Sequence, residues 1–359
     1  MYIEWLQIQN VRNLTNLRIQ PAARLNILVG PNASGKTSVL EAIYLLSMAR
    51  SFRTPRIREV IQYQKQSLIV TAGLRYTRSG LVNTGIEKGT GTTVINFNGE
   101  NVKKISEQAR NIPLILIAPD IQNLALGTPR QRRHWLDWAM FHVEPTYLDD
   151  WRDYHKALRQ RNTLLKGLPR AAATISGWEQ VMMETADRLT RQRQRFLGMI
   201  EENLALIVPE ALPFSVRVEL YQGWQAGQPL SLCLEKSRGA ERLAGFTRQG
   251  LHCSDIRFYA DERPLASFCS RGQIKVFQIL LLVSQAKTLE TITGTRPLYL
   301  LDDFQAEIDG EASHMLMDIL GRQDAQVFST ATAWQPAGPV LSDIKMFHVE
   351  RGNLVKVVE

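Results

Sequence analysis

The stretch Gly30-Pro31-Asn32-Ala33-Ser34-Gly35-Lys36-Thr37 predicts both a fold and a ligand. Two glycines five residues apart, followed by Lys and Thr, form the phosphate-loop pattern, in which successive backbone amides point at a phosphate group. The apolar run at 25–29 predicts a buried strand before the loop. The helical spacing over 36–48 predicts a helix after it, whose amino end attracts anions. Lys36 is expected to bridge the β- and γ-phosphates of ATP, and the Thr37 hydroxyl to bind magnesium.

A second motif near the other end of the chain carries carboxylates. The apolar run at 298–301 reads as a strand and ends in Asp302-Asp303. Phosphate-loop ATPases hold magnesium through a carboxylate at the carboxyl end of such a strand, which suits Asp302. Asp303 is placed to polarise the attacking water. A helix-capping pair of acids is the plainer alternative. Because the two motifs lie so far apart, a large insertion is expected to divide one nucleotide fold.

The segment Ser270-Arg271-Gly272-Gln273 opens an apolar helix at 274–286. Taken alone it is consistent with a plain helix start. At this distance before the two aspartates it looks like the signature motif of ATP-binding-cassette ATPases. In that family the signature reaches ATP held by the other subunit, so the likeness implies an ATP-dependent homodimer. Ala306-Glu307-Ile308-Asp309 then fits a loop at the dimer seam, and Ser329-Thr330 fits a switch that senses the γ-phosphate.

The middle of the chain predicts a helical insertion. Thr128-Pro129 is a typical helix start, because threonine caps free amides and proline suits the first helical position. Heptad-like apolar spacing runs through 147–165, breaks at 167–169, and resumes from Trp178 to Ile200. This pattern favours an antiparallel coiled-coil hairpin, with an ordinary helical subdomain as the alternative. The arginines at 188, 191, 193 and 195 form a cluster, in which Arg188, Arg191 and Arg195 share one helix face. This face is either a phosphate-binding stripe or a solvated face.

Segments rich in β-forming residues at 67–76, 81–87 and 92–98 predict an antiparallel meander. The expected fold is therefore an α/β, ATP-binding-cassette-type phosphate-loop ATPase head with an antiparallel β subdomain and an inserted helical arm. We expect residues 1–125 to form the amino-terminal half of the head, 126–245 the arm, and 246–359 the carboxyl-terminal half.

Bulk properties limit the cellular setting. The 359 residues carry a formal charge of +8, which favours a polyanionic partner such as DNA. The three cysteines lie far apart, which argues against a disulfide framework or a zinc site. The amino terminus lacks the pattern of a signal peptide, and the longest apolar run, 279–283, is too short to span a bilayer. A cytoplasmic protein without membrane contact is expected.

Together these elements resemble the RecF family, the recombination-repair branch of the SMC-like ATPases, over nearly the whole chain. Val11-Arg12-Asn13-Leu14 matches an amino-terminal Phe-Arg-Asn-like motif, Ser51-Phe52-Arg53-Thr54 follows the phosphate-loop helix as in the family, and 129–137 and 147–165 look like its arm. The chain departs from the family pattern at Leu251 and Cys253, has Asp303 where SMC relatives have glutamate, and lacks an expected glutamate between Pro119 and Asp120. With this resemblance, the residues expected to contact the nucleotide are Arg12, Asn13, Gly30, Pro31, Asn32, Ala33, Ser34, Gly35, Lys36, Thr37, Ser38, Ser270, Arg271, Gly272 and Gln273. The expected catalytic residues are Lys36, Asp302 and Asp303, and the expected magnesium ligands are Thr37 and Asp302.

The resemblance also implies a role. It implies an ATP-dependent dimer that binds gapped or single-strand/duplex DNA and, with RecO and RecR, helps to load RecA during repair, replication restart and the SOS response. Hydrolysis is expected to be weak and DNA-stimulated. The alternatives are an SMC-like clamp without repair specificity, a transport ATPase subunit, and an ATP sensor that hardly hydrolyses.

Overall fold

The chain divides into two compact units in a computed structural model. The structure describes residues 1–76, 80–118, 124–166, 172–303, 310–332 and 343–358. The first unit comprises residues 1–121 and 289–359, and the second comprises 122–288. The amino- and carboxyl-terminal parts of the chain thus form one unit, and the middle part forms the other. The expected division at 125 and 245 stays a prediction.

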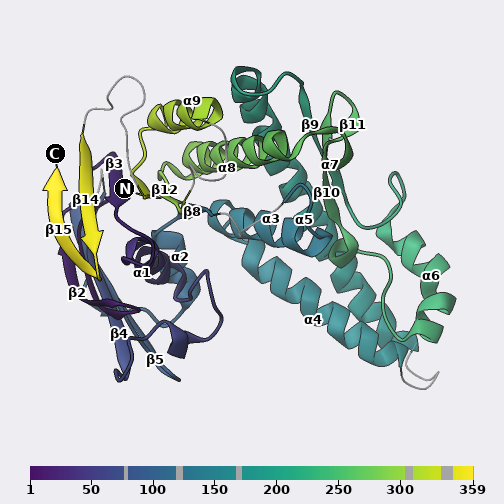
Figure 1. Ribbon diagram of the computed structural model, residues 1–359. Coiled ribbons are helices and arrows are strands. Elements are labelled where there is room, and N and C mark those ends of the chain that lie inside the picture. The colour runs from purple at the N-terminus through teal and green to yellow at the C-terminus, as the bar shows by residue number, and fades with distance from the viewer. Residues whose placement is uncertain (77–79, 119–123, 167–171, 304–309, 333–342, 359) are drawn as a thin grey trace. The chain divides into compact units, whose positions relative to one another are not determined.

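A six-stranded sheet in the first unit carries the phosphate loop. Its strand order is β15-β14-β3-β13-β12-β8, and all neighbours are parallel except β15 and β14, which run side by side as an antiparallel pair (Figure 1). The strands are β3 (Leu25–Val29), β8 (Leu114–Ile117), β12 (Leu298–Leu301), β13 (Val327–Ala331), β14 (Ile344–Glu350) and β15 (Asn353–Val358). The strands β3, β8, β12 and β13 are buried along their whole length, as continuous apolar runs in a parallel sheet require.

A second sheet in the same unit is antiparallel, in the order β2-β1-β4-β5-β6-β7. Its strands are β1 (Tyr2–Val11), β2 (Leu14–Ile19), β4 (Ser67–Tyr76), β5 (Gly80–Gly89), β6 (Thr93–Phe97) and β7 (Glu100–Asn101). One face is buried and the other exposed, so apolar and polar residues alternate along β2 and β5. The expected meander is confirmed as β4-β5-β6.

Helix α1 (Lys36–Met48) joins the two sheets into one core. Apolar residues of α1, including Leu40, Ile43 and Leu46, belong to the same buried cluster as Ile8 of the antiparallel sheet and Phe328 of the parallel sheet. The unit also contains α2 (Ile105–Asn111), α9 (Gly310–Gly321) and a short 3₁₀ turn at Ile57–Glu59. Because α1 is packed on almost every side, the loop that precedes it rests on a rigid support.

The second unit is mainly helical, with a small sheet in the order β11-β10-β9. Helix α3 (Pro129–Val143) begins with a reciprocal capping box between Thr128 and Gln131, as the sequence predicts. The other elements are α4 (Tyr147–Leu165), α5 (Ala172–Ile207), α6 (Leu230–Ala244), α7 (Leu265–Phe268), β9 (Val216–Tyr221), β10 (Asp255–Ala260), β11 (Arg263–Pro264) and turns at Val208–Glu210 and Leu251–Cys253. Helix α8 (Arg271–Thr293) begins in this unit and ends in the first.

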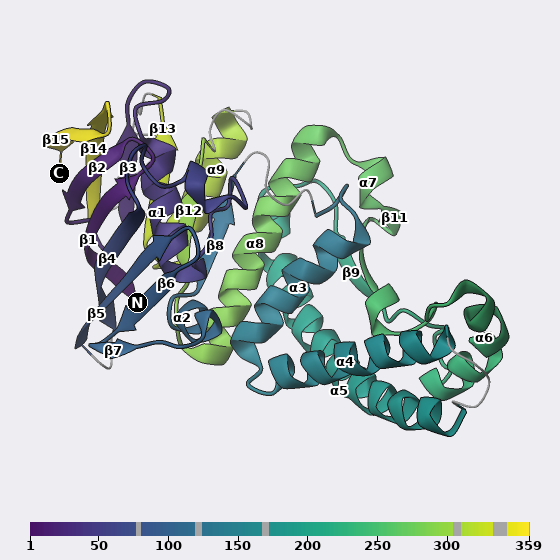
Figure 2. The same ribbon diagram turned by 90° about the horizontal axis from the view of Figure 1, so that it is seen from below.

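Helices α4 and α5 lie side by side and antiparallel (Figure 2). The ion pairs Asp150–Arg188 and Arg161–Glu179 show the direction, because the partner on α5 moves back from 188 to 179 as the residue on α4 advances from 150 to 161. The seam residues expected to be apolar and buried, such as Tyr154 and Leu189, are buried. The expected antiparallel helical hairpin of the inserted arm is therefore confirmed.

The arm uses several arginines internally. Arg161 is fully buried and makes ion pairs with Glu179 at 2.9 Å and Glu241 at 2.7 Å. Arg193, 2% exposed, donates to Tyr147 at 2.8 Å and to Asp137 at 2.5 Å. Of the three arginines expected on one helix face, Arg188 is paired with Asp150, whereas Arg191 and Arg195 are exposed.

In the described part of the chain, no helix combines the length and apolar character that crossing a bilayer requires.

The buried and exposed ion pairs of the arm provide a test of its stability. Arg161→Ala leaves two carboxylates, of which Glu241 is fully buried, without their cation, and should lower the free energy of unfolding by about 3–5 kcal/mol. Arg188→Ala breaks a pair whose arginine is 45% exposed and should cost about 0–1 kcal/mol. Denaturant unfolding of both variants measures the difference, and equal losses would contradict the internal role of Arg161.

Candidate nucleotide-binding site

The phosphate loop connects β3 to α1 in the first unit. Gly35, the last residue before the helix, has φ +117°, which side chains other than glycine rarely adopt. A Cβ atom at Gly35 would lie 3.1 Å from the side-chain amide of Asn13. The second glycine of the motif is therefore required both by the backbone turn and by the close approach of Asn13.

Lys36 is folded back over the loop that precedes it. Its Nζ donates to the carbonyl oxygens of Gly30 at 2.6 Å and Pro31 at 2.8 Å. Burial lowers the pKa of the Lys36 ammonium, and the carboxylates of Asp303 and Asp302 oppose this shift. The lysine is thus a desolvated cation whose charged form an anion in the loop would stabilise.

The two distant motifs meet at the carboxyl ends of β3 and β12, which lie on either side of β13. Thr37 donates from its hydroxyl to Asp302 Oδ1 at 2.9 Å, although 265 positions separate the two residues. Thr330, at the end of β13, donates to the same oxygen at 2.9 Å and accepts from the backbone amide of Asp303 at 2.8 Å. The parallel order β3-β13-β12 explains this meeting, because the carboxyl ends of parallel strands share one edge of the sheet.

The donor set at this edge fits magnesium. A hydroxyl oxygen on Thr37 and a carboxylate oxygen on Asp302 are hard oxygen ligands, the kind that Mg²⁺ prefers. Burial raises the pKa of Asp302, while hydrogen bonds from Thr37 and Thr330 act in the opposite direction. A cation beside this carboxylate would offset the cost of its desolvation.

These residues surround a pocket of about 510 Å³. The pocket is lined by Arg12, Asn13, Asn32, Ala33, Ser34, Gly35, Lys36, Thr37, Ser38, Arg53, Asp303, Thr330 and Thr332. Most of the expected nucleotide contacts in the first unit are therefore together. Gly30, Pro31 and Asp302 are not in the lining. They contact residues that are, because the carbonyls of Gly30 and Pro31 accept from Lys36 and the carboxylate of Asp302 accepts from Thr37.

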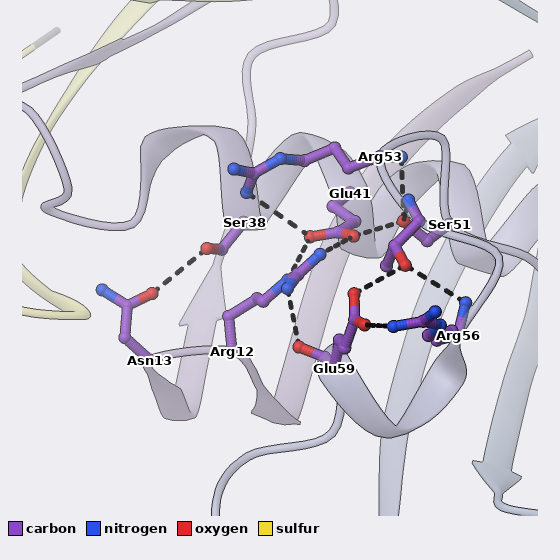
Figure 3. A network of polar contacts seen from close by, with 9 residues as sticks. Arg12, Asn13, Ser38, Glu41, Ser51, Arg53, Arg56 and Glu59 are labelled. Atoms are coloured by element: carbon purple, nitrogen blue, oxygen red, sulfur yellow. Dashed lines mark hydrogen bonds and ion pairs between the residues drawn. The ribbon is translucent and has the colours of Figure 1, made fainter.

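Arg12, which lines the pocket, is held in place by a network of polar contacts (Figure 3). Its guanidinium makes two hydrogen bonds of 2.8 Å to the carboxylate of Glu41, which is fully buried, and one of 2.6 Å to the carbonyl of Glu59. These bonds raise the pKa of Arg12. Ser51 also donates to Glu41, and Arg53 lies 3.9 Å from it. Helix α1 thereby fixes the segment that carries Arg53.

Some residues of the pocket were missed by reasoning from the sequence. Arg53 and Thr332 line it but were not expected there as contacts. Arg53 belongs to the quoted family segment 51–54, so that likeness was the available signal. Thr332 follows the strand that carries the expected switch Ser329-Thr330, and its position depends on where that strand lies in the sheet.

The signature residues belong to the second unit, whereas the pocket residues belong to the first. Ser270 and Gln273 form a reciprocal cap at the start of α8: the Ser270 amide donates to the Gln273 side chain at 2.9 Å, and the Gln273 amide donates to the Ser270 hydroxyl at 3.3 Å. Ser270, Arg271 and Gly272 are exposed. A helix start needs this cap in any case, so the trans role of the signature stays a prediction.

Other expected features fall elsewhere. The seam loop 306–309 and the Pro119-Asp120 position lie outside the described residues. Leu251, which departs from the family pattern, is buried in the second unit, and the Cys253 thiol donates to the Arg248 carbonyl at 3.2 Å. Neither residue is among those that line the nucleotide pocket.

A parallel sheet with a phosphate loop and an acid at neighbouring strand ends, joined through one core to an antiparallel sheet, defines the head of an ATP-binding-cassette-type ATPase. A family model described as the RecF/RecN/SMC N terminal domain matches residues 2–352. The chain is 35% identical over 365 residues to the DNA replication and repair protein RecF of Nitrosococcus oceani, with 100% of both chains covered. This chain belongs to the RecF family.

Further relatives agree with this assignment. The DNA replication and repair protein RecF of Vibrio campbellii is 34% identical over 357 residues, which covers 99% of this chain and 100% of that one. A solved structure of the recombination mediator protein RecF-ATP in the RecFOR pathway has the same fold, with a TM-score of 0.87 and 23% identity over 100% of this chain and 98% of that one. An Smc head bound to the C-winged helix domain of ScpA is more distant, with a TM-score of 0.59 and 16% identity over 100% and 97%.

The raised pKa of Asp302 gives a test of the metal-binding prediction. A carboxyl whose pKa is higher in the folded than in the unfolded chain contributes stability at low pH that is lost as the pH rises through its folded-state pKa. At neutral pH, Asp302→Asn should therefore leave the melting temperature of the ligand-free protein unchanged or higher.

The same variant should lose the stabilisation by magnesium and ATP, which for wild type at 100 times Kd is about 2.7 kcal/mol. Thermal unfolding with and without Mg-ATP measures both effects. Full Mg-ATP stabilisation in Asp302→Asn would contradict the assignment of this carboxylate.

Proposed function

We propose that this protein binds Mg-ATP in the pocket of the first unit. The observation that carries the proposal is the 2.9 Å hydrogen bond between Thr37 and Asp302, which brings a phosphate loop and a strand-end carboxylate from opposite ends of the chain into one site. The desolvated ammonium of Lys36 and the anion-attracting amino end of α1 support phosphate as the ligand.

Each residue of the pocket has a distinct proposed task. Lys36 would move its bonds from the loop carbonyls to the β- and γ-phosphates, while Thr37 and Asp302 would hold magnesium. Magnesium, when bound, neutralises developing charge on the phosphates. Asp303 lines the pocket and would orient the attacking water. An aspartate is shorter than the glutamate of SMC relatives, which supports weak ATP hydrolysis that acts as a timer.

Closure by a second copy is the next part of the proposal. Ser270 and the amides around Gly272 stand exposed at the amino end of the long helix α8, where anions are favoured. We infer that this end grips the γ-phosphate held by the partner subunit, so that ATP drives formation of a homodimer. Hydrolysis would then release the two subunits.

The cellular role follows from the family. The relatives are named as DNA replication and repair proteins, and one solved structure is described as a recombination mediator in the RecFOR pathway. We propose that the ATP-bound dimer binds gapped or single-strand/duplex DNA in the cytoplasm and, with RecO and RecR, helps to load RecA during recombinational repair, replication restart and the SOS response. The net charge of +8 supports salt-dependent, sequence-tolerant contact with the DNA backbone.

The lysine of the phosphate loop tests the ATP-binding step. Lys36→Met removes the charge that would pair with the phosphates, which should weaken ATP binding by about 2–5 kcal/mol, roughly 30-fold or more in Kd. ATP-stimulated dimers should disappear in sedimentation. Lys103→Met, which removes an exposed lysine of the same unit, should behave like wild type. If Lys36→Met formed dimers at the ATP concentrations that dimerise the wild type, the mechanism would be refuted.

The serine of the signature tests the trans arrangement. Ser270→Arg adds bulk at the exposed start of α8 and should leave monomer ATP affinity unchanged while it blocks ATP-dependent dimers. Ser231→Arg, at an exposed site of the same unit on α6, is the matched control and should still dimerise. If Ser270→Arg lost ATP affinity as a monomer, the assignment of Ser270 to the partner's nucleotide would be wrong.

A further inference from the structure

The turn between β14 and β15 lies against the phosphate loop. Strand β14 runs parallel to β3 in the register Ile344–Leu25 to His348–Val29, so both strands end at the same edge of the sheet. The phosphate loop follows β3 there, and the turn at 350–352 follows β14. A carboxyl-terminal hairpin is thereby brought to the site that binds the nucleotide in the proposed function.

One carbonyl oxygen of the phosphate loop accepts hydrogen bonds from residues near both ends of the chain. The Ser34 carbonyl accepts a hydrogen bond from the backbone amide of Gly352 at 2.8 Å and a second from the side-chain amide of Asn13 at 3.1 Å. The side-chain oxygen of Asn13 accepts in turn from the Ser38 hydroxyl at 3.1 Å, as Figure 3 shows. Asn13 therefore uses both ends of its amide on the loop and on the first turn of α1.

The carboxyl-terminal hairpin approaches both the phosphate loop and the turn that carries Asn13 too closely for a side chain to lie between them. A Cβ atom at Gly352 would lie 2.1 Å from the carbonyl oxygen of Asn13, and Gly352 has φ +79°. A Cβ atom at Gly30 would lie 2.2 Å from the carbonyl oxygen of Val349. Because these obstacles are backbone atoms, an added methyl group cannot be accommodated by a change of rotamer alone.

Because of the geometry of the peptide bond, the contacts of the Ser34 carbonyl fix the direction of the Gly35 amide. In a planar trans peptide the C=O and the N–H point in opposite directions. The Ser34 carbonyl is held towards Gly352 and Asn13, so the N–H of Gly35, in the same peptide group, points to the opposite side of the loop. Gly35 lines the pocket, and its amide is one of those that would face a phosphate oxygen.

We propose that the carboxyl-terminal turn is a positioning element of the nucleotide site. Gly352 and Asn13 act through the Ser34 carbonyl to fix the direction of the Gly35 amide, and Asn13 serves as a positioning residue instead of a contact to the nucleotide. The expected effect on ATP binding rests on the proposed function. The expected effect on the loop concerns the ligand-free protein and does not depend on that function.

The chain offers a matched pair of glycines for the test. Gly352 and Gly99 both have positive φ, +79° and +87°, in antiparallel hairpin turns of the first unit. A Cβ atom at Gly99 would meet nothing within 4 Å. Gly352→Ala and Gly99→Ala therefore impose the same kind of backbone strain, but only the former places a methyl group against the backbone of Asn13, the residue whose side chain also holds the Ser34 carbonyl.

Two readouts separate this proposal from the proposed function. In the ligand-free protein, hydrogen exchange of the peptide that contains Gly35 should be faster in Gly352→Ala than in wild type and unchanged in Gly99→Ala. In equilibrium binding of Mg-ATP, Gly352→Ala should lose roughly 10- to 100-fold in affinity, since small misplacements of a site have effects of this size. Gly99→Ala should bind as wild type does.

Unchanged exchange and affinity in Gly352→Ala would overturn the proposal, as would equal changes in both alanine variants. If Gly352→Ala fails to fold, Asn13→Ala takes its place. It removes one of the two donors to Ser34 and should show the same faster exchange, and unchanged exchange in that variant is equally fatal. Should wild type bind no ATP, the proposed function fails, and the exchange experiment still decides whether the turn holds the loop.

Discussion

The hydrogen bond between Thr37 and Asp302 is the constraint on which the rest of the structure depends. It requires that β3 and β12 lie on either side of β13 and run parallel, so that their carboxyl ends meet at one edge. The first unit must therefore be built from both ends of the chain, and the residues between them must leave and return. The helical unit at 122–288 fills that interval without interrupting the sheet.

The site brings together charged groups that burial keeps from full contact with water. Burial works against the charged forms of both Lys36 and Asp302, which lowers one pKa and raises the other. The fold tolerates this because the surrounding elements are rigid: α1 is packed between two sheets, and Glu41, buried within it, holds Arg12 through two hydrogen bonds. Groups that are preorganised and poorly solvated bind a complementary ligand strongly, since little reorganisation is needed.

The helical arm shows that a basic sequence and a basic surface are different properties. Arg161 and Arg193 are buried and neutralised by carboxylates, and Arg188 is paired with Asp150 at the surface. These cations stabilise the contact between α4 and α5 and are poor candidates for phosphate contacts. In the proposed function, contact with the DNA backbone would fall to exposed residues such as Arg191 and Arg195.

The sequence by itself determined the local features: the phosphate loop, the helix at 36–48, the buried strands and the two helices of the arm. Each depends on residues close together in the chain, through backbone freedom at glycine or a regular spacing of apolar side chains. The phosphate-loop and strand-end motifs together led us to expect Thr37 and Asp302 in one site, but tertiary structure alone decided their direct hydrogen bond and the contacts of Ser34 with Gly352 and of Arg193 with Asp137. Those contacts depend on the order of strands and the packing of helices. These bring together segments that are distant in the chain, and the local pattern of one segment does not specify its contacts with the other.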